Sequence, residues 1–359
     1  MPWSTMKHLR AQLWAGVSLS LFGAVLGSGC RHVAAEDCRQ SHPAGPGEYA
    51  CTVQGFRDRD FLLRLPPTYD GVRRLPVIVA MHGAAGSKEG FNSLTCPGGD
   101  TNHPSCLSQV ADGAGFIVVY PDGTRITNLT AASRTWNSGG GGPRELRCEH
   151  ACKDGVDDVA YFGALLSELS AVITYDEKRL YLTGFSNGAA MSHRLACEVP
   201  ERIAAIAPVA GANLFAGAAV CNPRRATPIL HIHGDADPCW PYLGGLGQCA
   251  ADQMNSGTYV SVDETIVGAT LGGGTVQVGW VSRLGCNPAG TTTSLSSHPR
   301  DTYTACRDGA TVSRVRVIGA GHTWPGGSQY LSSDRIGPVA NEFSASQLIV
   351  DFFQSIPAR

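Results

Sequence analysis

Three residues far apart in the sequence could act together in nucleophilic catalysis: Ser186, Asp237 and His322. A serine hydroxyl attacks only when a base removes its proton, and the base needs an acid to orient it. Ser186 is the central residue of the pentapeptide 184–188, G-F-S-N-G, which follows the β-favouring residues 180–183 and precedes small residues. A G-x-S-x-G between a strand and a helix is typical of a nucleophile elbow, a sharp turn that exposes the serine.

The base and the acid are chosen by their position after strands. His322 lies in a glycine-flanked loop after an expected strand, 312–318. Asp237 and Asp235 follow another expected strand, 229–232, and Asp237 is preferred because it lies further into the loop. Asp235 is expected to tie down its own turn. The order Ser, Asp, His, each after a strand, is the order of an α/β-hydrolase triad.

Such chemistry also needs N–H donors for the oxyanion of the tetrahedral intermediate. The backbone N–H of Asn187, directly after the serine, is one expected donor, and that of Ala84 is the other. Ala84 follows His82-Gly83 at the end of an apolar strand. His82 and His233 each precede a glycine at a strand end, so we expect them to position backbone.

Apolar runs alternate with helical patterns along the chain. This alternation predicts an α/β fold with a mostly parallel, doubly wound sheet flanked by helices. The acids Asp157 and Asp158 are expected to serve the start of the helix 156–173. The expected elements are an antiparallel strand pair within 49–65, further strands at 75–81, 116–120, 180–183, 203–209, 229–232 and 312–318, and helices at 156–173 and 348–353.

Several motifs together resemble the polyhydroxybutyrate depolymerase/feruloyl esterase family of secreted α/β-hydrolases. They are His82-Gly83, the elbow with Ala189-Ala190-Met191, A-P-V-A-G at 207–211, H-G-D-A-D-P at 233–238, and G-H-T-W-P-G-G at 321–327. The resemblance extends from about Tyr49 to the C-terminus. It implies the α/β-hydrolase fold and a serine carboxylesterase without a cofactor or metal. One departure is Ala84, where many relatives have cysteine.

The resemblance leaves the substrate open. We expect an ester or polyester, with poly- or oligo(3-hydroxybutyrate) first and feruloyl or acetyl-xylan esters as the alternative. A binding protein on a hydrolase scaffold that lacks activity is the alternative of another class. Four aromatic residues are candidates for the wall of the substrate cleft, with ordinary core packing as the other interpretation: Trp136, Trp240, Tyr242 and Trp324.

Composition and the first residues bear on partners and compartment. The formal net charge is −2 and Lys/Arg runs are absent, which argues against a nucleic-acid partner. Basic residues before an apolar run predict a signal peptide at 1–29, then a tether at 30–47 and a single catalytic domain at 48–359. Cys30 could be lipidated and tether the protein to a membrane; cleavage after Ala35 or a retained anchor are the alternatives. We expect an exported monomer, extracellular or in the cell envelope.

Cysteine usage supports export. There are 13 cysteines, and removal of Cys30 leaves an even number for disulfide bonds. Pairing of near neighbours predicts Cys38–Cys51, Cys96–Cys106, Cys148–Cys152, Cys197–Cys221, Cys239–Cys249 and Cys286–Cys306.

Two metal-site interpretations compete with this one. His231-Ile232-His233-Gly234-Asp235 resembles the start of a binuclear metallohydrolase site, but Ala236 follows where that motif needs histidine. Cys148, His150 and Cys152 could form part of a zinc site, although paired cysteines are favoured in an exported chain. We therefore expect no metal.

Overall fold

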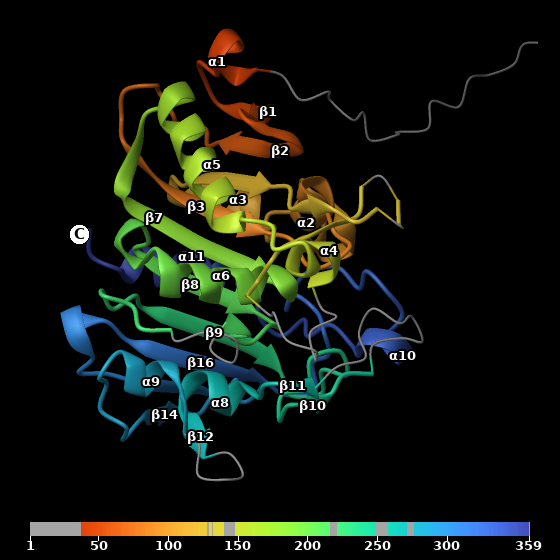
Figure 1. Cartoon of the computed structure of the whole chain (residues 1–359), viewed down its shortest axis with the longest axis vertical. Coiled ribbons are helices and arrows are strands. Elements are labelled where there is room, and N and C mark those ends of the chain that lie inside the picture. The colour runs from red at the N-terminus through yellow and green to blue at the C-terminus, as the bar shows by residue number, and fades with distance from the viewer. Residues whose placement is uncertain are drawn as a thin grey trace, which may run out of the picture. The chain divides into compact units, whose positions relative to one another are not determined.

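A twisted ten-stranded sheet forms the centre of the fold (Figure 1). The computed structural model describes residues 37–127, 129–130, 132–139, 148–215, 221–248, 258–270 and 276–358. The predicted signal peptide, Cys30, the first part of the tether and Cys249 lie outside these residues, so the predictions made for them stay predictions. None of the described helices is long and apolar enough to cross a membrane.

The order of the strands confirms the predicted α/β-hydrolase fold. Neighbouring strands from β4 to β16 run parallel, whereas β1, β2, β15 and β14 pair antiparallel at the two ends of the sheet. The pairing of β15 and β14 beyond β16 was not predicted. In sheet order the strands are β1 (Gly47–Val53), β2 (Phe56–Leu65), β4 (Ile117–Pro121), β3 (Leu75–Met81), β7 (Tyr175–Phe185), β8 (Ala205–Val209), β9 (Ile229–Gly234), β16 (Val312–Val317), β15 (Arg300–Tyr303) and β14 (Thr291–Thr293).

The central strands are apolar because both of their faces are covered. Every residue of β3 is buried. Val77, Val79 and Met81 enter one hydrophobic core, and Ile78 and Ala80 enter the other. This two-residue alternation divides the side chains of one strand between the two layers of helices.

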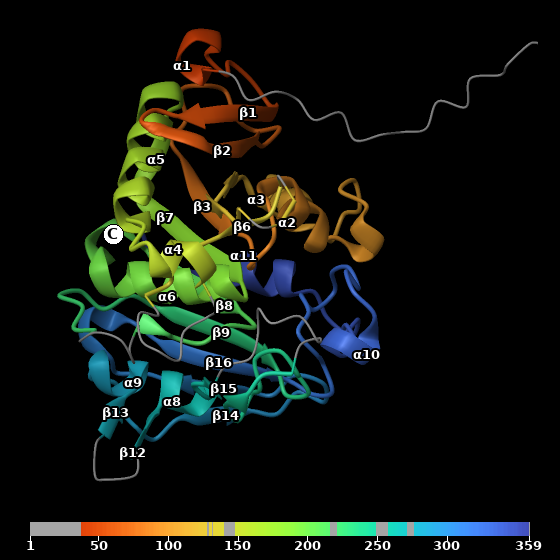
Figure 2. The same ribbon diagram turned by 45° about the vertical axis from the view of Figure 1, so that its right-hand side comes forward.

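Helices cover both faces of the sheet (Figure 2). One core contains residues of α1 (Cys38–Ser41), α5 (Asp158–Val172), α6 (Asn187–Glu198), α8 (Val262–Ile266) and α9 (Trp280–Arg283). The other contains residues of α2 (Lys88–Leu94), α3 (Leu107–Ala114) and α11 (Ala345–Ser355). Smaller elements are α4 (Glu149–Lys153), α10 (Ser333–Ile336) and the strand pairs β5 (Thr124–Arg125) with β6 (Arg134–Thr135), β10 (Gly245–Leu246) with β11 (Thr258–Tyr259), and β12 (Gly268–Thr270) with β13 (Val276–Val278).

The two acids at the start of α5 have different roles. Asp157 is the N-cap, and its carboxylate accepts a hydrogen bond from the N–H of Ala160 at 2.8 Å, as predicted. Asp158 is buried and forms an ion pair with Arg59 at 2.5 Å. Asp158 also accepts from the N–H of Asn137. It therefore joins α5 to β2 and to the loop after β6.

Disulfide bonds join five of the predicted cysteine pairs, which confirms that part of the sequence analysis. The bond between Cys148 and Cys152 removes both thiolates from the alternative zinc site. The sixth predicted pair includes Cys249, which lies outside the described residues.

Candidate active site

The turn between β7 and α6 has the geometry of a nucleophile elbow. Ser186 has φ 54° and ψ −115°, a backbone conformation that residues other than glycine rarely adopt. The N–H of Ser186 donates to the carbonyl of Val209 at 2.9 Å, which fixes the turn against β8. Ser186 is half-buried at the start of α6, where the positive end of the helix dipole favours negative charge.

The glycines of the elbow are required by close backbone contacts. A Cβ on Gly188 would overlap the carbonyl groups of Met81 and His82, and a Cβ on Gly184 would overlap the carbonyl of Gly188. The first turn of α6 therefore packs directly on the end of β3. This contact explains why the G-x-S-x-G pattern is needed here.

His322 and Asp237 form a buried acid–base pair. Nδ1 of His322 lies 2.7 Å from Oδ2 of Asp237. The other carboxylate oxygen, Oδ1, accepts from the N–H groups of Cys239 and Trp240, both at 2.8 Å. Burial alone would raise the pKa of Asp237, but the charge of His322 and the hydrogen bonds from His233 and His322 outweigh it and hold that pKa at about 2. The carboxylate is therefore charged at neutral pH.

The imidazole of His322 lies beside the elbow. Its ring centroid is 4.8 Å from that of Phe185, the residue directly before Ser186. The ring of Tyr330 packs edge-on against that of Phe185, with centroids 5.9 Å apart, and Tyr330 keeps 37% of its surface exposed. Sequence analysis did not single out Tyr330, because no motif marks the loop that carries it.

Asp235 connects two loops instead of stabilising its own turn, so that expectation was wrong. Its carboxylate accepts from the N–H of Gly319 at 2.7 Å and from Nε of Arg316 at 2.9 Å. Both partners belong to β16 and the loop that leads to His322. Asp235 therefore holds together the loop that carries Asp237 and the loop that carries His322.

The loop after β3 packs on the elbow. A Cβ on Gly83 would lie 3.1 Å from the ring of Phe185 and 3.3 Å from Cβ of Ser186. The N–H of Gly86 donates to the carbonyl of Gly83, which closes a tight turn that carries the exposed Ala84. The predicted donor at Ala84 thus belongs to a loop in direct contact with the elbow.

His82 holds this loop with its ring, in agreement with the positioning role expected for it. Its Nδ1 donates to the carbonyl of Gly83 at 2.7 Å, and its Nε2 accepts from the N–H of Gly123 at 2.9 Å. Burial lowers the pKa of His82 to about 4, so the ring is neutral at pH 7.

Asn187 is anchored through its side chain. Oδ1 accepts from the N–H of Trp136 at 2.7 Å and from the hydroxyl of Thr135 at 3.2 Å. Nδ2 donates to the carbonyl of Trp136 at 3.0 Å and to the hydroxyl of Ser138 at 3.2 Å. The backbone N–H of Asn187 is the first of α6, and the first N–H groups of a helix have no acceptor within it.

The four aromatic candidates are all buried, with exposed fractions of 2% for Trp136, 3% for Trp240, 8% for Tyr242 and 0% for Trp324. The indole of Trp136 donates to the carbonyl of His82, and that of Trp324 donates to the hydroxyl of Ser346. Trp240 packs on Tyr259 at 4.6 Å. Each ring thus has a packing role, and contact with substrate stays a prediction for all four.

Asp237, Cys239 and His322 bring metal-ligand atom types within 4.8 Å of one another. Cys239 is disulfide-bonded, so it offers no thiolate. The carboxylate of Asp237 already accepts from two backbone N–H groups and faces two imidazoles. These residues fit an acid–base pair, and we do not assign them to a metal.

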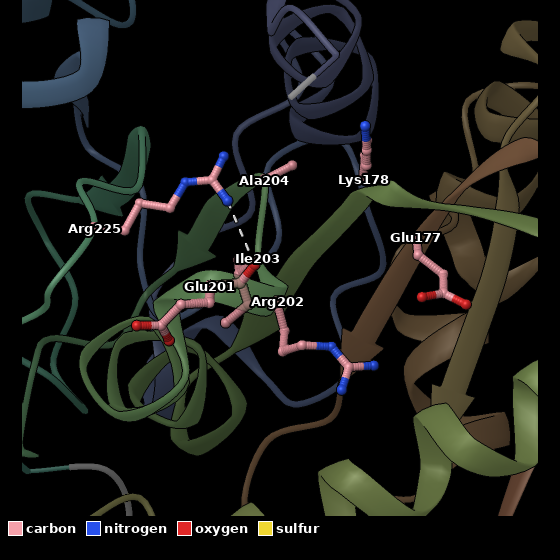
Figure 3. Close-up of a pocket in the computed structure, with 7 residues that line it drawn as sticks. All are labelled: Glu177, Lys178, Glu201, Arg202, Ile203, Ala204 and Arg225. Carbon is pink, nitrogen blue, oxygen red and sulfur yellow. Dashed lines mark hydrogen bonds between the residues drawn. The ribbon is translucent and has the colours of Figure 1, made fainter.

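A surface cavity lies at the opposite end of the parallel strands (Figure 3). Lys178 lies in β7 eight residues before Ser186, which corresponds to about 26 Å of extended chain. The cavity therefore does not belong to the candidate site. Its lining residues are Glu177, Lys178, Glu201, Arg202, Ile203, Ala204 and Arg225.

Known proteins similar to this chain identify its class. Residues 159–256 match the family model described as "Phospholipase/Carboxylesterase". Over 283 residues the chain is 31% identical to the "Putative esterase NocK" of Nocardia uniformis subsp. tsuyamanensis, an alignment that covers 77% of this chain and 73% of that protein. The chain belongs to this esterase family of α/β-hydrolases, and it is an enzyme.

Two further similarities are more distant. Feruloyl esterase B of Piromyces equi is 28% identical over 192 residues, which cover 53% of this chain but only 31% of that protein. An acetyl xylan esterase from Aspergillus awamori has a TM-score of 0.47 at 15% identity, with 74% of this chain and 89% of that chain covered.

Proposed function

We propose that this esterase acts through a catalytic triad of Ser186, His322 and Asp237. The observation that supports it best is the buried pair of His322 and Asp237, in which Nδ1 lies 2.7 Å from Oδ2. The imidazole packs against Phe185, directly before Ser186 in its strained turn.

The reaction follows from these positions. With Nδ1 bound to Asp237, Nε2 of His322 is the nitrogen that takes the proton of Ser186 while its oxygen attacks the acyl carbon. The N–H groups of Ala84 and Asn187 stabilise the oxyanion of the tetrahedral intermediate. The imidazolium then donates its proton to the leaving alcohol, and water hydrolyses the acyl-enzyme by the same steps. No cofactor takes part.

The charge on Asp237 has a defined use in this scheme. The carboxylate orients the imidazole and stabilises the imidazolium that forms when Ser186 loses its proton. Because the pKa of Asp237 is held at about 2, the acid keeps its charge throughout the pH range in which imidazole can act as a base.

Substitution of the nucleophile tests the proposal. Ser186→Ala should fold normally and lose about 10⁶-fold in kcat for ester hydrolysis. Hydrolysis at the wild-type rate by Ser186→Ala would disprove the assignment.

We propose an ester of a carbohydrate or a hydroxyacid as the substrate. A relative named feruloyl esterase favours aromatic esters of sugars, and the resemblance to polyhydroxybutyrate depolymerases favours short polyesters. A side-by-side assay would use methyl ferulate, acetylated xylan, a 3-hydroxybutyrate oligomer and a polyester film, with Ser186→Ala as the blank. The substrate with the highest kcat/KM decides between carbohydrate esters and hydroxyacid esters.

Export remains part of the proposal. Five disulfide bonds among the described residues suit an oxidising compartment, in agreement with the predicted signal peptide. Lipidation of Cys30 and a monomeric state stay predictions. Mass spectrometry of the N-terminus and light scattering on the mature protein would test them.

A further inference from the structure

Two imidazoles, not one, face the carboxylate of Asp237. Oδ2 lies 2.7 Å from Nδ1 of His322 and 3.3 Å from Nε2 of His233. Either imidazole could bind a second proton, become an imidazolium cation and form an ion pair with the carboxylate. Catalysis needs that charge for His322 alone, because only His322 lies beside the elbow.

His233 is the last member of a buried hydrogen-bonded chain. The indole N–H of Trp280 donates to Nδ1 of His193 at 3.0 Å. Nε2 of His193 lies 3.4 Å from Nδ1 of His231, and Nε2 of His231 lies 3.2 Å from Nδ1 of His233. We call Trp280, His193, His231 and His233 the histidine relay.

The relay ends at the loop after β9 that carries Asp237, which we call the acid loop. Nε2 of His233 lies 2.8 Å from the carbonyl oxygen of Trp240, in addition to its contact with Asp237. The chain therefore begins at a group that can only donate, an indole N–H, and ends at groups that can only accept, a carbonyl and a carboxylate.

These two ends set the direction of every bond between them. Nδ1 of His193 must accept from the indole, so its proton is on Nε2 and is donated to His231. The same reasoning places the proton of His231 and that of His233 on Nε2. A second proton on any of the three rings would have to sit on Nδ1 and would point at an N–H.

Local structure explains why these rings meet. His231 and His233 are two residues apart on β9, so both point to the same face of the sheet as Ile229. That face carries α6 and α9 (Figure 2). His193 projects from α6 toward them, and its ring stacks on that of His231 at 5.6 Å. All three rings are at most 1% exposed.

The electrostatics agree with neutral rings at His193 and His231. Burial lowers the pKa of His193 to about 3. Burial lowers the pKa of His231 well below its ordinary value, with smaller contributions from His233, His193 and Arg314. Among the described residues, the titratable and charged groups that face the relay are Asp237 from the acid loop, Tyr242 edge-on against the ring of His233, and, from β16, Arg314 in register with His231 and Arg316 in register with His233.

We propose that the histidine relay reserves the negative charge of Asp237 for His322, by keeping Nδ1 of His233 occupied so that His233 cannot bind a second proton. The relay residues are positioning residues, and the proposal rests on the triad proposed above. His322 differs from His233 because no relay among the described residues occupies its second nitrogen, which is left to take the proton of the serine.

The tautomers can be measured directly in the wild-type protein. In ¹⁵N-histidine-labelled enzyme we expect His193, His231 and His233 to carry their proton on Nε2 and not to titrate between pH 5 and 9. Protonation of His233 on Nδ1, or titration of His233 in that range, would overturn the proposal. Because this experiment does not measure activity, failure of the relay and failure of the triad, which Ser186→Ala tests, can be told apart.

A matched pair of variants tests the function of the relay. His231→Leu removes the donor to His233, whereas His231→Gln keeps an N–H at a similar position. With His231→Leu we expect His233 to titrate and the acid limb of the kcat/KM profile to steepen from one proton to two. For an added imidazole with the ordinary pKa near 6.5, the ratio of kcat/KM at pH 6 to that at pH 8 should fall about fourfold below the wild-type ratio.

The glutamine variant should retain the one-proton limb and an untitrated His233. Equal pH profiles for the two variants would contradict the proposal, because a purely structural role predicts losses that do not depend on pH. If His231→Leu does not fold, the tautomer measurement on the wild-type protein still tests the proposal, because it needs no variant.

Discussion

Lowering the pH from 7.5 to 5.5 should destabilise the folded protein, because buried imidazoles cannot bind protons there. Burial lowers the pKa of His82 to about 4 and that of His193 to about 3, and it lowers the pKa of His231 well below its ordinary value. The unfolded chain binds these protons near pH 6.5. Since the unfolded state then holds more protons, the free energy of unfolding falls as the pH falls.

The size of this effect follows from linkage. At pH 5.5 each imidazole with an unfolded pKa near 6.5 and a much lower folded pKa takes about 1.4 kcal/mol from the free energy of unfolding. The three together take about 4 kcal/mol, a large part of the 5–15 kcal/mol typical of a domain. Asp237 contributes nothing to this change, because its folded pKa of about 2 confines its effect to pH below about 4.

Urea unfolding at the two pH values, followed by tryptophan fluorescence with the disulfide bonds intact, measures the difference. His193→Gln keeps an acceptor for Trp280 and a donor for His231 but cannot be protonated, so its loss between the two pH values should shrink to about 2.7 kcal/mol. His42→Asn, a change at an exposed histidine, should show the wild-type loss. A wild-type loss below about 1 kcal/mol, or an unchanged loss in His193→Gln, would refute the reasoning.

Two further predictions concern the candidate site. Asp237→Asn should lower kcat about 10⁴-fold with little change in KM, because the amide cannot stabilise the imidazolium. The control Asp235→Asn should lower kcat less than about tenfold. Steady-state kinetics in which the two variants behave alike would contradict the assignment of the acid. Asn187→Ala removes four side-chain hydrogen bonds from the elbow and should cost about 2–3 kcal/mol of stability and at least about tenfold in kcat. Urea unfolding and kinetics measure both effects, and an unchanged kcat would separate this side chain from the position of the oxyanion donor.

The parallel part of the sheet could be predicted because burial on both faces leaves a simple pattern. The run 75–81 becomes β3 with the predicted bounds. The strands β15 and β14 were missed for the opposite reason: all of their residues except Tyr303 are partly or fully exposed, so no apolar run marks them. A strand that pairs through its backbone at the end of a sheet needs no hydrophobic side chains.

The candidate site shows the same division. Ser186, Asp237 and His322 follow a motif and an order of loops, which are properties of the sequence. The contact of His233 with Asp237 depends on the path of the acid loop after β9. In the sequence, the one signal of this contact was the two-residue spacing of His231 and His233. That spacing predicts that the two side chains share a face of the sheet, but not which residues pack on that face. The burial of the four aromatic candidates could not be predicted either, because it depends on packing by segments distant in the sequence.

The strands β15 and β14 have a consequence for engineering of this enzyme. Without them β16, whose end leads to His322, would present unpaired backbone groups to other molecules. The exposed margin is instead β14, three threonines long and two strands away. Short polar margins of this kind resist aggregation by strand addition. A peptide designed to dock on β14, or a fusion made there, would leave β16, the strand before His322, paired with β15 and β9.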